Sequence, residues 1–302
     1  MEPPEFFDLK AYLSKRKAVV DAALEACFSE PEGPISDLMA SMKYSLFADG
    51  KRLRPILCLA GAEAVGGTET DILTVACALE LIHTYSLIHD DLPVMDDDDL
   101  RRGQPSNHKV FGEAVALLAG DGLLTEAFNL MAEAELTGSV SPSALLKVIG
   151  LIARASGYRG MIGGQLVDIQ LEGKSADSSL VEFIHKRKTG DLITASVKSG
   201  AILGGGNESQ IQAITSYGER IGLAFQISDD ILDIEGNSIE MGKKAGADEQ
   251  KGKITYPASV GLSRSKEIQA ELVEAAIESL NIFDQAADPL RQIAGYIVER
   301  KK

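Results

Sequence analysis

Residues 69–91 read TETDILTVACALELIHTYSLIHD. Their apolar side chains recur at steps of three and four residues with few breakers between them, which is the period of an α-helix. The same period returns, in places with internal breaks, over residues 110–136, 143–157, 178–203, 208–235 and 263–302. Alternating strand patterns are nearly absent, and Gly, Pro and Ser gather between the helical segments. Helices joined by short turns around one core predict an all-α antiparallel bundle, with residues 1–302 in a single domain.

Two clusters of aspartates lie far apart in this helical sequence. The first, DDLPVMD, runs from Asp90 to Asp96, and the second, DDILD, runs from Asp229 to Asp233. Carboxylates this close repel one another, and beside apolar neighbours they are costly unless a cation or a proton neutralises them. Mg²⁺ typically takes one or two carboxylates and completes its octahedron with water and substrate phosphate. The clusters therefore indicate chemistry on a diphosphate.

Helical spacing places further residues beside each cluster, because residues four and seven apart share a face. His83 and Ser86 precede Asp90 by seven and four residues. Pro93 should end or kink this helix, which would bring Asp96 back toward Asp90 from the following loop. In the second cluster one face carries Gly222, Gln226, Asp229, Asp230 and Asp233, and the glycine leaves room for a ligand or a neighbouring helix.

Each acidic run also has an ordinary interpretation. Taken alone, the run from Asp96 to Asp99 is typical of a solvated loop or a helix cap. The second cluster fits that interpretation less well, because AFQISDDILDI is apolar on both sides. A calcium-binding loop starting at Asp98 would put Leu100 and Lys109 where oxygen ligands are required, which argues against an EF-hand.

Composition limits the class of protein. The chain has 302 residues, is 45% hydrophobic and carries a net charge of −15, which argues against a general nucleic-acid binder. Three cysteines, Cys27, Cys58 and Cys77, form no Cys-x-x-Cys pair and argue against a disulfide framework or a zinc site. The N-terminal sequence lacks the features of a signal peptide, and no uncharged apolar run is long enough to span a bilayer. We expect a cytoplasmic protein with no transmembrane segment.

Basic residues are local exceptions in this acidic chain. Lys51 and Arg54 lie in GKRLRP, and Arg101 and Arg102 follow the first aspartates directly. Arginine forks and lysine charges at helix starts suit phosphate oxygens. Surface solubility is the alternative, and we favour it for three other basic residues, Arg187, Lys244 and Lys251. Flanking Gly and Pro residues make that alternative weaker for the first four.

The motifs together resemble those of the trans-prenyltransferases, the isoprenyl diphosphate synthases. The resemblance is carried in family order by DGKRLRP, ELIHTYSLIHDDLPVMDDDDLRRGQPSNHKVFGEAVALLAGD, GGQLVDI, HKRKTGDLI and FQISDDILDIEGNSIEMGKKAGADEQKGKITYP. It implies the isoprenoid synthase fold, an antiparallel helix bundle around a deep central cavity, in a homodimer. It also implies condensation of isopentenyl diphosphate with an allylic diphosphate.

The resemblance implies a role for each charged residue. Asp90 and Asp96 would bind two Mg²⁺ ions and Asp229 a third, with Asp91, Asp230 and Asp233 in support; Mn²⁺ shares these ligand preferences. Arg101, Lys188 and Lys243 would contact the allylic diphosphate, whereas Lys51, Arg54, His83 and Arg102 would hold isopentenyl diphosphate. Thr189 and Gln226 would face the developing cation, and Lys253 lies where the family closes a C-terminal loop over the site.

Product length depends on what stops the growing chain. Tyr85, five residues before Asp90, is the one aromatic side chain in this part of the helix, and Ser86 follows it. Tyr85 could be an ordinary core tyrosine, but an aromatic here resembles the farnesyl pattern of bacterial synthases. We therefore expect farnesyl diphosphate, with geranylgeranyl diphosphate as the alternative. A class I terpene cyclase would lack the second diphosphate pocket, and an inactive regulatory subunit would usually have lost aspartates.

Overall fold

The structure is a computed structural model that describes residues 7–28, 33–69, 72–134, 140–174, 177–235 and 253–299. The helices in these ranges are α1 (Leu9–Cys27), α2 (Ser36–Leu46), α3 (Leu53–Ala64), α4 (Leu73–Asp90), α5 (Asn107–Phe111), α6 (Glu113–Ala132), α7 (Pro142–Ser156), α8 (Met161–Leu171), α9 (Ser178–Ile184), α10 (Asp191–Leu203), α11 (Glu208–Glu235), α14 (Tyr256–Val260), α15 (Leu262–Ser279) and α16 (Asp288–Glu299). Short 3₁₀ turns lie at Gly33–Ile35 and Gln285–Ala287, and a π-helical turn at His185–Gly190 joins α9 to α10. A hairpin of β1 (Leu100–Arg101) and β2 (Gln104–Pro105) is the one sheet in the described ranges.

The all-α prediction is confirmed, and the predicted helices lie close to where the apolar period placed them. Within the predicted segment 69–91, Leu73–Asp90 form α4, and residues 208–235 form α11 along their full length. The predicted segment over residues 110–136 is divided at Gly112, whose φ of 82° ends α5 and begins α6. The period therefore located the helices, and the glycine located the break between two of them.

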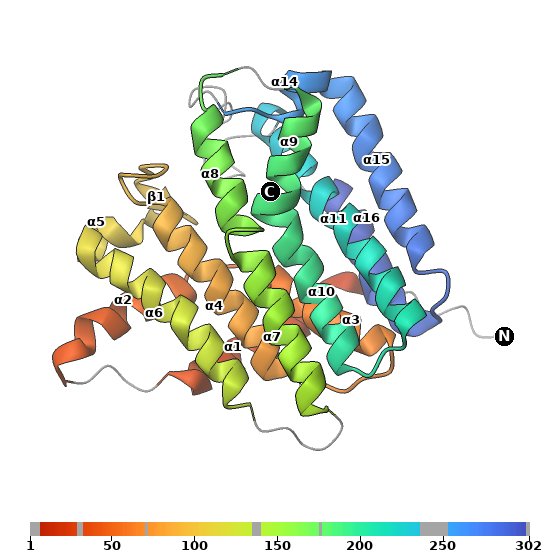
Figure 1. Cartoon of the computed structure of the whole chain (residues 1–302), viewed down its shortest axis with the longest axis horizontal. Coiled ribbons are helices and arrows are strands. Elements are labelled where there is room, and N and C mark those ends of the chain that lie inside the picture. Colours follow the sequence, from red (N-terminus) through yellow and green to blue (C-terminus); the bar gives the residue numbers. More distant parts are fainter. Residues whose placement is uncertain are drawn as a thin grey trace.

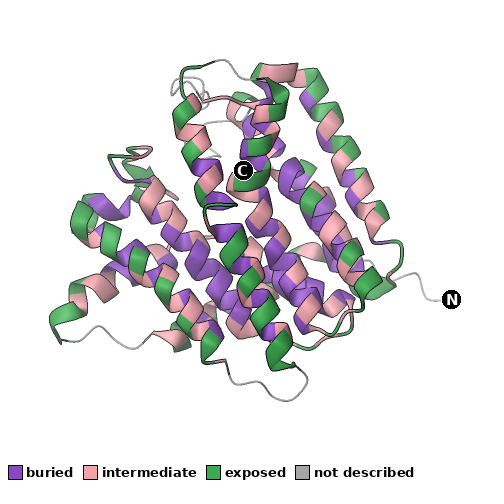
Figure 2. Cartoon of the chain, in the orientation of Figure 1, coloured by how far each residue is buried: buried purple, intermediate pink, exposed green. Residues whose placement is uncertain are grey.

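Two central helices, α4 and α10, are surrounded by the others (Figure 1). Helix α4 packs against α6, α3, α1 and α2, and α10 packs against α3, α11 and α7. Buried residues therefore cover most sides of these helices instead of a single stripe (Figure 2). Such all-round apolar character is typical of a helix in the middle of a core.

Glycines let α3 and α10 approach unusually closely. A Cβ atom placed on Gly200 of α10 would lie 1.8 Å from the carbonyl oxygen of Cys58 on α3. A Cβ on Gly61 of α3 would lie 2.2 Å from the carbonyl oxygen of Val197 on α10. Both distances are far below van der Waals contact, so the spacing of these two helices requires glycine at both positions.

Helix α6 is long and apolar enough to be a candidate membrane span, with a mean hydropathy of 1.3. It nevertheless carries Asp121 and Glu126, and it packs along α4. Only 33% of its most apolar window is buried within the chain. A buried inner side and an exposed apolar outer side describe α6 better than a bilayer-spanning segment does.

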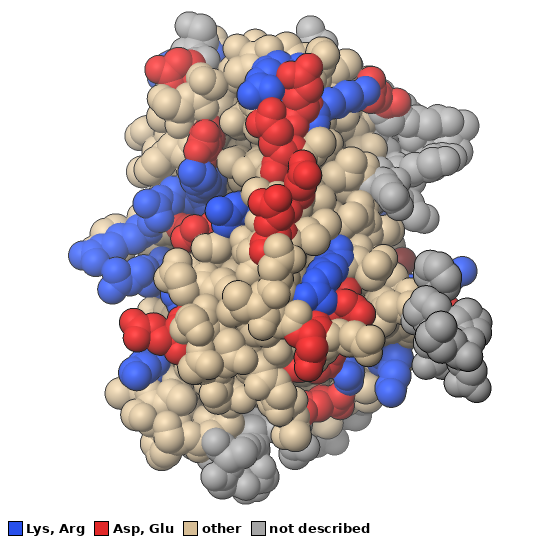
Figure 3. Space-filling view, turned by 90° about the vertical axis from the view of Figure 1, so that its right-hand side faces the viewer, with Lys and Arg blue, Asp and Glu red and all other residues tan. Residues whose placement is uncertain are grey.

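Much of the negative charge lies on the outer surface. Glu267, Glu271, Glu274 and Glu278 are exposed on α15 at helical spacing, and Figure 3 shows acidic side chains in a column on this side of the molecule. Arg264 forms ion pairs of 3.0 Å with both Glu267 and Glu271. The net charge of the chain is thus largely a property of solvated faces, which leaves the interior free to have its own charge pattern.

We predict that Gly200→Ala lowers the free energy of unfolding by at least about 2 kcal/mol, because overpacking of this kind forces the helices apart. Urea denaturation monitored by circular dichroism measures the change. Gly150→Ala on α7 is the matched control, because a Cβ there meets nothing within 4 Å. That exposed helical position should gain roughly 0.5–1 kcal/mol from higher helix propensity. Equal effects at both positions would contradict the close approach of α3 and α10.

Candidate active site

The first aspartate cluster lies where α4 ends, and the presence of Pro93 predicted this helix end. The helix stops at Asp90, and the chain folds back so that the Asp96 backbone N–H donates to the Asp90 carbonyl at 2.9 Å. Burial raises the pKa of Asp90 to about 6, a shift that Asp96 reinforces and Lys188 opposes. Asp90, Asp96 and Lys188 therefore share one region of low solvent access.

Adjacent Asp91 has a different environment. Its side chain is 2% exposed, and Arg101 Nε donates to it at 2.9 Å. Arg101 Nη2 also lies 3.4 Å from Asp98. The Asp91–Arg101 pair holds the β1–β2 hairpin against the end of α4. Arg101, expected from the family resemblance to contact the allylic diphosphate, therefore also has a protein partner.

The second cluster lies on α11, where Asp229 and Asp233 are one turn apart. Asp230 is 3% exposed and accepts a hydrogen bond of 2.8 Å from the backbone N–H of Tyr256. His185 Nε2 lies 3.3 Å from the same carboxylate. Burial lowers the pKa of His185 to about 4, so the imidazole is neutral at physiological pH. Asp230 thus joins α11 to the π-helical turn and to the start of α14.

Gly222 leaves room for a neighbouring segment of backbone and not for a ligand, which were the two alternatives considered from the sequence. A Cβ atom on Gly222 would lie 2.7 Å from the Cα atom of Gly190, in the π-helical turn. One residue before Gly190, Thr189 donates from Oγ1 to Gln226 Oε1 at 2.9 Å. Close approach at the glycines therefore places two of the predicted reaction-centre residues in direct contact. π-Helical turns are often found at functional sites.

A pocket with an empty volume of about 400 Å³ opens beside these residues. Its lining residues are Asp168, Ile184, His185, Lys188, Gln226, Asp230, Lys253, Ile254 and Thr255. Lys188 donates to Asp168 at 2.6 Å, and Lys253 Nζ lies 3.4 Å from Asp96. The structure thus brings residues of both clusters and the C-terminal segment to one place. Lys243, predicted to contact the same diphosphate, lies outside the described residues.

A cluster of basic side chains lies beside α4, near the start of α3. Burial lowers the pKa of Arg54 to about 10, and its Nε is buried with no hydrogen-bond partner. Burial, together with Arg54 and Arg102, lowers the pKa of His83 well below its usual value. The Arg102 guanidinium makes a weak contact of 3.4 Å with the Ala48 carbonyl. Cations buried together in this way repel one another, and an anion bound between them would relieve that repulsion.

Lys51 and Arg52 flank this cluster and have separate roles. Lys51 Nζ lies 5.9 Å from the centre of the Tyr296 ring on α16. Arg52 is 3% exposed and is bound by Glu80 at 2.9 Å and by Asp21 at 2.7 Å. Arg52 is therefore a structural residue of the basic motif, whereas Lys51 and Arg54 are not held by that network.

Backbone strain is concentrated at these loops. Arg52, Asp97 and Arg102 are the non-glycine residues with positive φ among those described, at 51°, 49° and 54°. Such conformations persist where the surrounding structure requires them, and they cluster at binding sites. Arg102 and Gly103, the latter with a φ of 78°, are the two residues of the tight turn between β1 and β2, which requires positive φ at both.

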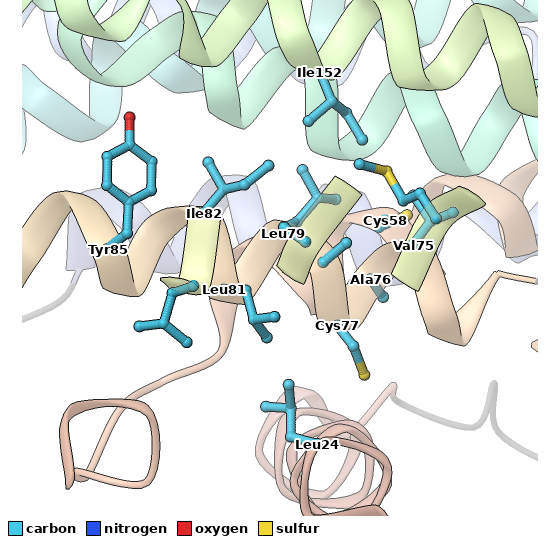
Figure 4. Packing of buried hydrophobic residues seen from close by; sticks show 14 of the residues in the cluster. Leu24, Cys58, Val75, Ala76, Cys77, Leu79, Leu81, Ile82, Tyr85 and Ile152 are labelled. Carbon is cyan, nitrogen blue, oxygen red and sulfur yellow. The ribbon is translucent and has the colours of Figure 1, made fainter. Parts of the chain in front are cut away.

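Tyr85 and Ser86 lie on α4 below Asp90. Tyr85 is 5% exposed, and its hydroxyl is buried with no hydrogen-bond partner. Figure 4 shows the Tyr85 ring on the same side of α4 as Ile82 and Leu79, facing the helix that carries Ile152. The Ser86 hydroxyl donates to the His83 carbonyl at 2.8 Å. Tyr85 thus lies between the aspartates and an apolar region further down α4.

Asp168 is the residue that sequence analysis missed. It belongs to GGQLVDI, a stretch that contributed only to the family resemblance. Its ion pair with Lys188 spans two elements, α8 and the π-helical turn, so no local spacing indicates it. The available signal was a single carboxylate on an otherwise apolar helix, MIGGQLVDIQL.

The carboxylates fit Mg²⁺ better than a metal held by protein alone. Among the described residues, no three His, Cys, Asp or Glu side chains are grouped closely enough to hold an ion by themselves. Mg²⁺ usually binds through one or two carboxylates together with substrate phosphates. Asp90 and Asp96 of the first cluster and Asp229 and Asp233 of the second could supply those carboxylates.

Comparison with known proteins gives a consistent result over almost the full length. The polyprenyl synthetase family matches residues 36–292. A farnesyl diphosphate synthase from Geobacillus stearothermophilus is 46% identical over 292 residues, 97% of this chain and 98% of the relative. The heterodimeric geranylgeranyl pyrophosphate synthase large subunit 1, chloroplastic, from Arabidopsis thaliana is 45% identical over 99% of this chain and 81% of its own length.

Solved structures agree in fold. Geranylgeranyl pyrophosphate synthetase from Pyrococcus horikoshii superposes with a TM-score of 0.87 at 32% identity, over 97% of this chain and 98% of that chain. An FPP/GFPP synthase from Zymomonas mobilis, in an apo structure, gives 0.85 at 37% identity, over 96% of this chain and 98% of that chain.

Asp90 and Asp91 should respond oppositely to the same substitution. The folded-state pKa of Asp90 is raised above its ordinary value, so its ionised form costs stability at pH values above about 6. We predict that Asp90→Asn raises the free energy of unfolding at pH 7.5 by roughly 1–3 kcal/mol in EDTA, an effect that fades toward pH 4. Asp91→Asn should instead lower it by roughly 1–3 kcal/mol, because Arg101 loses a charged partner. Urea titrations at both pH values measure these changes, and a destabilised Asp90→Asn protein at pH 7.5 would contradict the prediction.

Proposed function

The chain belongs to the polyprenyl synthetase family, and from that premise we propose that it condenses isopentenyl diphosphate with dimethylallyl and geranyl diphosphates to give farnesyl diphosphate. It is a short-chain trans-prenyltransferase, and relatives of similar identity are named for both the farnesyl and the geranylgeranyl product. Geranylgeranyl diphosphate is therefore the alternative product, and the reaction is the same in both cases.

The observation that carries this proposal is the half-buried basic cluster of Arg54, His83 and Arg102. Arg54 lies close enough to Asp229 for the carboxylate charge to raise its pKa, which opposes the larger effect of burial. Arg54 nevertheless forms no ion pair in the described part of the chain. A terpene cyclase needs a single diphosphate site, which the aspartate side of the pocket would supply. A second group of unneutralised cations is what a second diphosphate requires.

The residues divide the reaction between them. Lys51, Arg54, His83 and Arg102 would hold isopentenyl diphosphate with its double bond toward the pocket. Arg101, Lys188 and Lys243 would hold the allylic diphosphate, and Thr189 and Gln226 would direct oxygen dipoles toward the allylic cation. Bound Mg²⁺, for which Mn²⁺ could substitute, would neutralise negative charge on the departing diphosphate and be held by Asp90, Asp96, Asp229 and Asp233. Neutral His83 can donate a hydrogen bond to phosphate without adding to the repulsion between the arginines.

Proton loss completes the condensation. The double bond of isopentenyl diphosphate attacks the cation, a new carbon–carbon bond forms, and the adjacent carbon loses a proton to the departed diphosphate. Water must be excluded, because it would capture the cation. Ile82, Leu79 and Tyr85 give α4 the apolar face on which such a chain could lie.

We predict that the purified chain alone converts geranyl and isopentenyl diphosphates to farnesyl diphosphate, and that EDTA abolishes turnover. Arg54→Ala should raise the KM for isopentenyl diphosphate by a factor of roughly ten to a hundred, with a smaller change for geranyl diphosphate. Steady-state assays with each substrate varied in turn measure the two constants. Arg187→Ala is the control, because Arg187 is exposed and paired with Asp191 at 3.0 Å. A hydrocarbon product from geranyl diphosphate alone, or no turnover without another subunit, would contradict the proposal.

Product length should be set by the bulk of Tyr85. Each added isoprene unit buries about five carbons, worth on the order of 4 kcal/mol, so burial favours continued growth and steric contact must stop it. We predict that Tyr85→Ala lengthens the product by at least one unit. Tyr85→Phe, which keeps the ring and removes the unpartnered hydroxyl, should leave the length unchanged. Chromatography of the dephosphorylated alcohols distinguishes the products, and farnesol from the alanine variant would place the barrier elsewhere.

We also propose that the protein is a cytoplasmic homodimer that pairs through α5 and α6. Val110, Leu117 and Leu118 are 48%, 46% and 55% exposed on these helices, which leaves an apolar face uncovered. Sedimentation at micromolar concentration should give about twice the chain mass of 32.2 kDa. Leu118→Glu should shift this species toward the monomer, and a monomeric wild-type protein would overturn the assignment.

A further inference from the structure

His89 lies one residue before the first aspartate cluster and has no part in the reaction described above. It belongs to the last turn of α4, and its side chain is 24% exposed. Its Nε2 lies 2.9 Å from the Leu117 carbonyl oxygen on α6, whereas the Asp121 carboxylate is 3.9 Å away. A carbonyl oxygen can only accept a hydrogen bond, so the imidazole donates from Nε2. His89 therefore ties the end of α4 to α6.

A glycine on α6 leaves the room that this imidazole occupies. A Cβ atom placed on Gly120 would lie 2.1 Å from His89 Nε2 and 2.3 Å from its Cδ2. Both distances are far below van der Waals contact, so a larger residue at this position would displace the ring. Helix α6 thus holds the His89 side chain in two ways, through the Leu117 carbonyl and through the space at Gly120.

The imidazole also meets Tyr85, which lies one turn earlier on α4. The centres of the two rings are 5.6 Å apart and their planes make an angle of 84°, the edge-to-face arrangement that aromatic pairs prefer. The Tyr85 hydroxyl is buried and has no hydrogen-bond partner. No polar contact of its own therefore fixes the Tyr85 ring, and its position depends on packing to which His89 contributes.

We propose that His89 is a positioning residue for product length, which holds the Tyr85 ring across the path of the growing isoprenoid chain. The inference rests on the proposed function, in which the bulk of Tyr85 stops growth. A tyrosine ring can leave its place by rotation to another rotamer, and a chain that presses on the ring favours such a rotation. The edge-to-face contact opposes it, and the hydrogen bond to Leu117 keeps the imidazole from giving way.

The barrier then has two separable properties. Tyr85 supplies its bulk, and the unit of His89, Leu117 and Gly120 supplies its stiffness. Loss of bulk removes the barrier, so the whole product distribution should shift to greater length. Loss of stiffness leaves a ring that blocks the path for only part of the time, so the product should become a mixture of two lengths.

The test compares the products of the purified full-length protein and its variants by chromatography of the dephosphorylated alcohols. His89→Ala should raise the ratio of the product one isoprene unit longer to the wild-type product by about tenfold, the upper end of what an aromatic pair contributes. Gly120→Ala, which displaces the imidazole from the α6 side, should change the ratio in the same direction. Gly122→Ala is the matched control on the same helix, because a Cβ there meets only the flexible side chain of Met42, at 3.1 Å. It should leave product length unchanged.

A double-mutant cycle distinguishes positioning of Tyr85 from a direct effect of His89 on the chain. In the Tyr85→Ala background His89→Ala should change the product ratio no further, because the ring that it holds is gone. Additive effects of the two substitutions would overturn the proposal. Wild-type products from His89→Ala, beside longer products from Tyr85→Ala, would overturn this inference alone. A wild-type protein that forms no condensation product would instead contradict the proposed function, and the inference with it.

Discussion

Two separate groups of like-charged residues, a basic one near the start of α3 and an acidic one at the end of α4, are the constraint around which this molecule is arranged. Near the start of α3, Arg54 lies close to Arg102 and His83, and burial lowers the pKa of each. At the end of α4, burial raises the pKa of Asp90, and the nearby charge of Asp96 adds to this shift. If the two groups could meet, they would neutralise one another and neither would bind a ligand strongly. The helices keep them apart, as the proposed binding of two diphosphates requires.

The surrounding structure maintains that separation through contacts with little freedom to move. Arg52, the one arginine of its motif that is fully paired, fixes the start of α3 to α1 and α4 through Asp21 and Glu80. Backbone-to-backbone approaches at Gly61 and Gly200 set the distance between α3 and α10, and those at Gly190 and Gly222 set the distance between the π-helical turn and α11. A side chain at any of these positions would alter the spacing of the helices that carry the proposed site.

Local sequence patterns predicted the helices and the fold of the chain at the first aspartate cluster. Contacts between residues far apart in the sequence could not be predicted from them. The apolar period located α4 and α11, and Pro93 correctly indicated that Asp96 folds back to Asp90. The sequence did not distinguish Asp90 from Asp91, because the partner of Asp91 depends on how the hairpin turns at Arg102. It also gave Asp168 no role, since the partner of Asp168 lies on another element. The family resemblance supplied roles for residues such as Lys188 and Gln226, and the contacts of Lys188 with Asp168 and of Gln226 with Thr189 are consistent with a shared site.

The contact between Lys253 and Asp96 joins residues 157 positions apart. During synthesis from the N-terminus, the first aspartate cluster and the basic pocket leave the ribosome long before α14 exists. A partly made chain therefore carries the first aspartate cluster and the basic residues without the second cluster or α14, and its pocket is not yet enclosed. The closing contacts are also among those of highest sequence separation, which are slow to form because chain entropy must be lost first. The pocket is thus completed only when the C-terminal part of the chain has been made and has folded onto the first cluster.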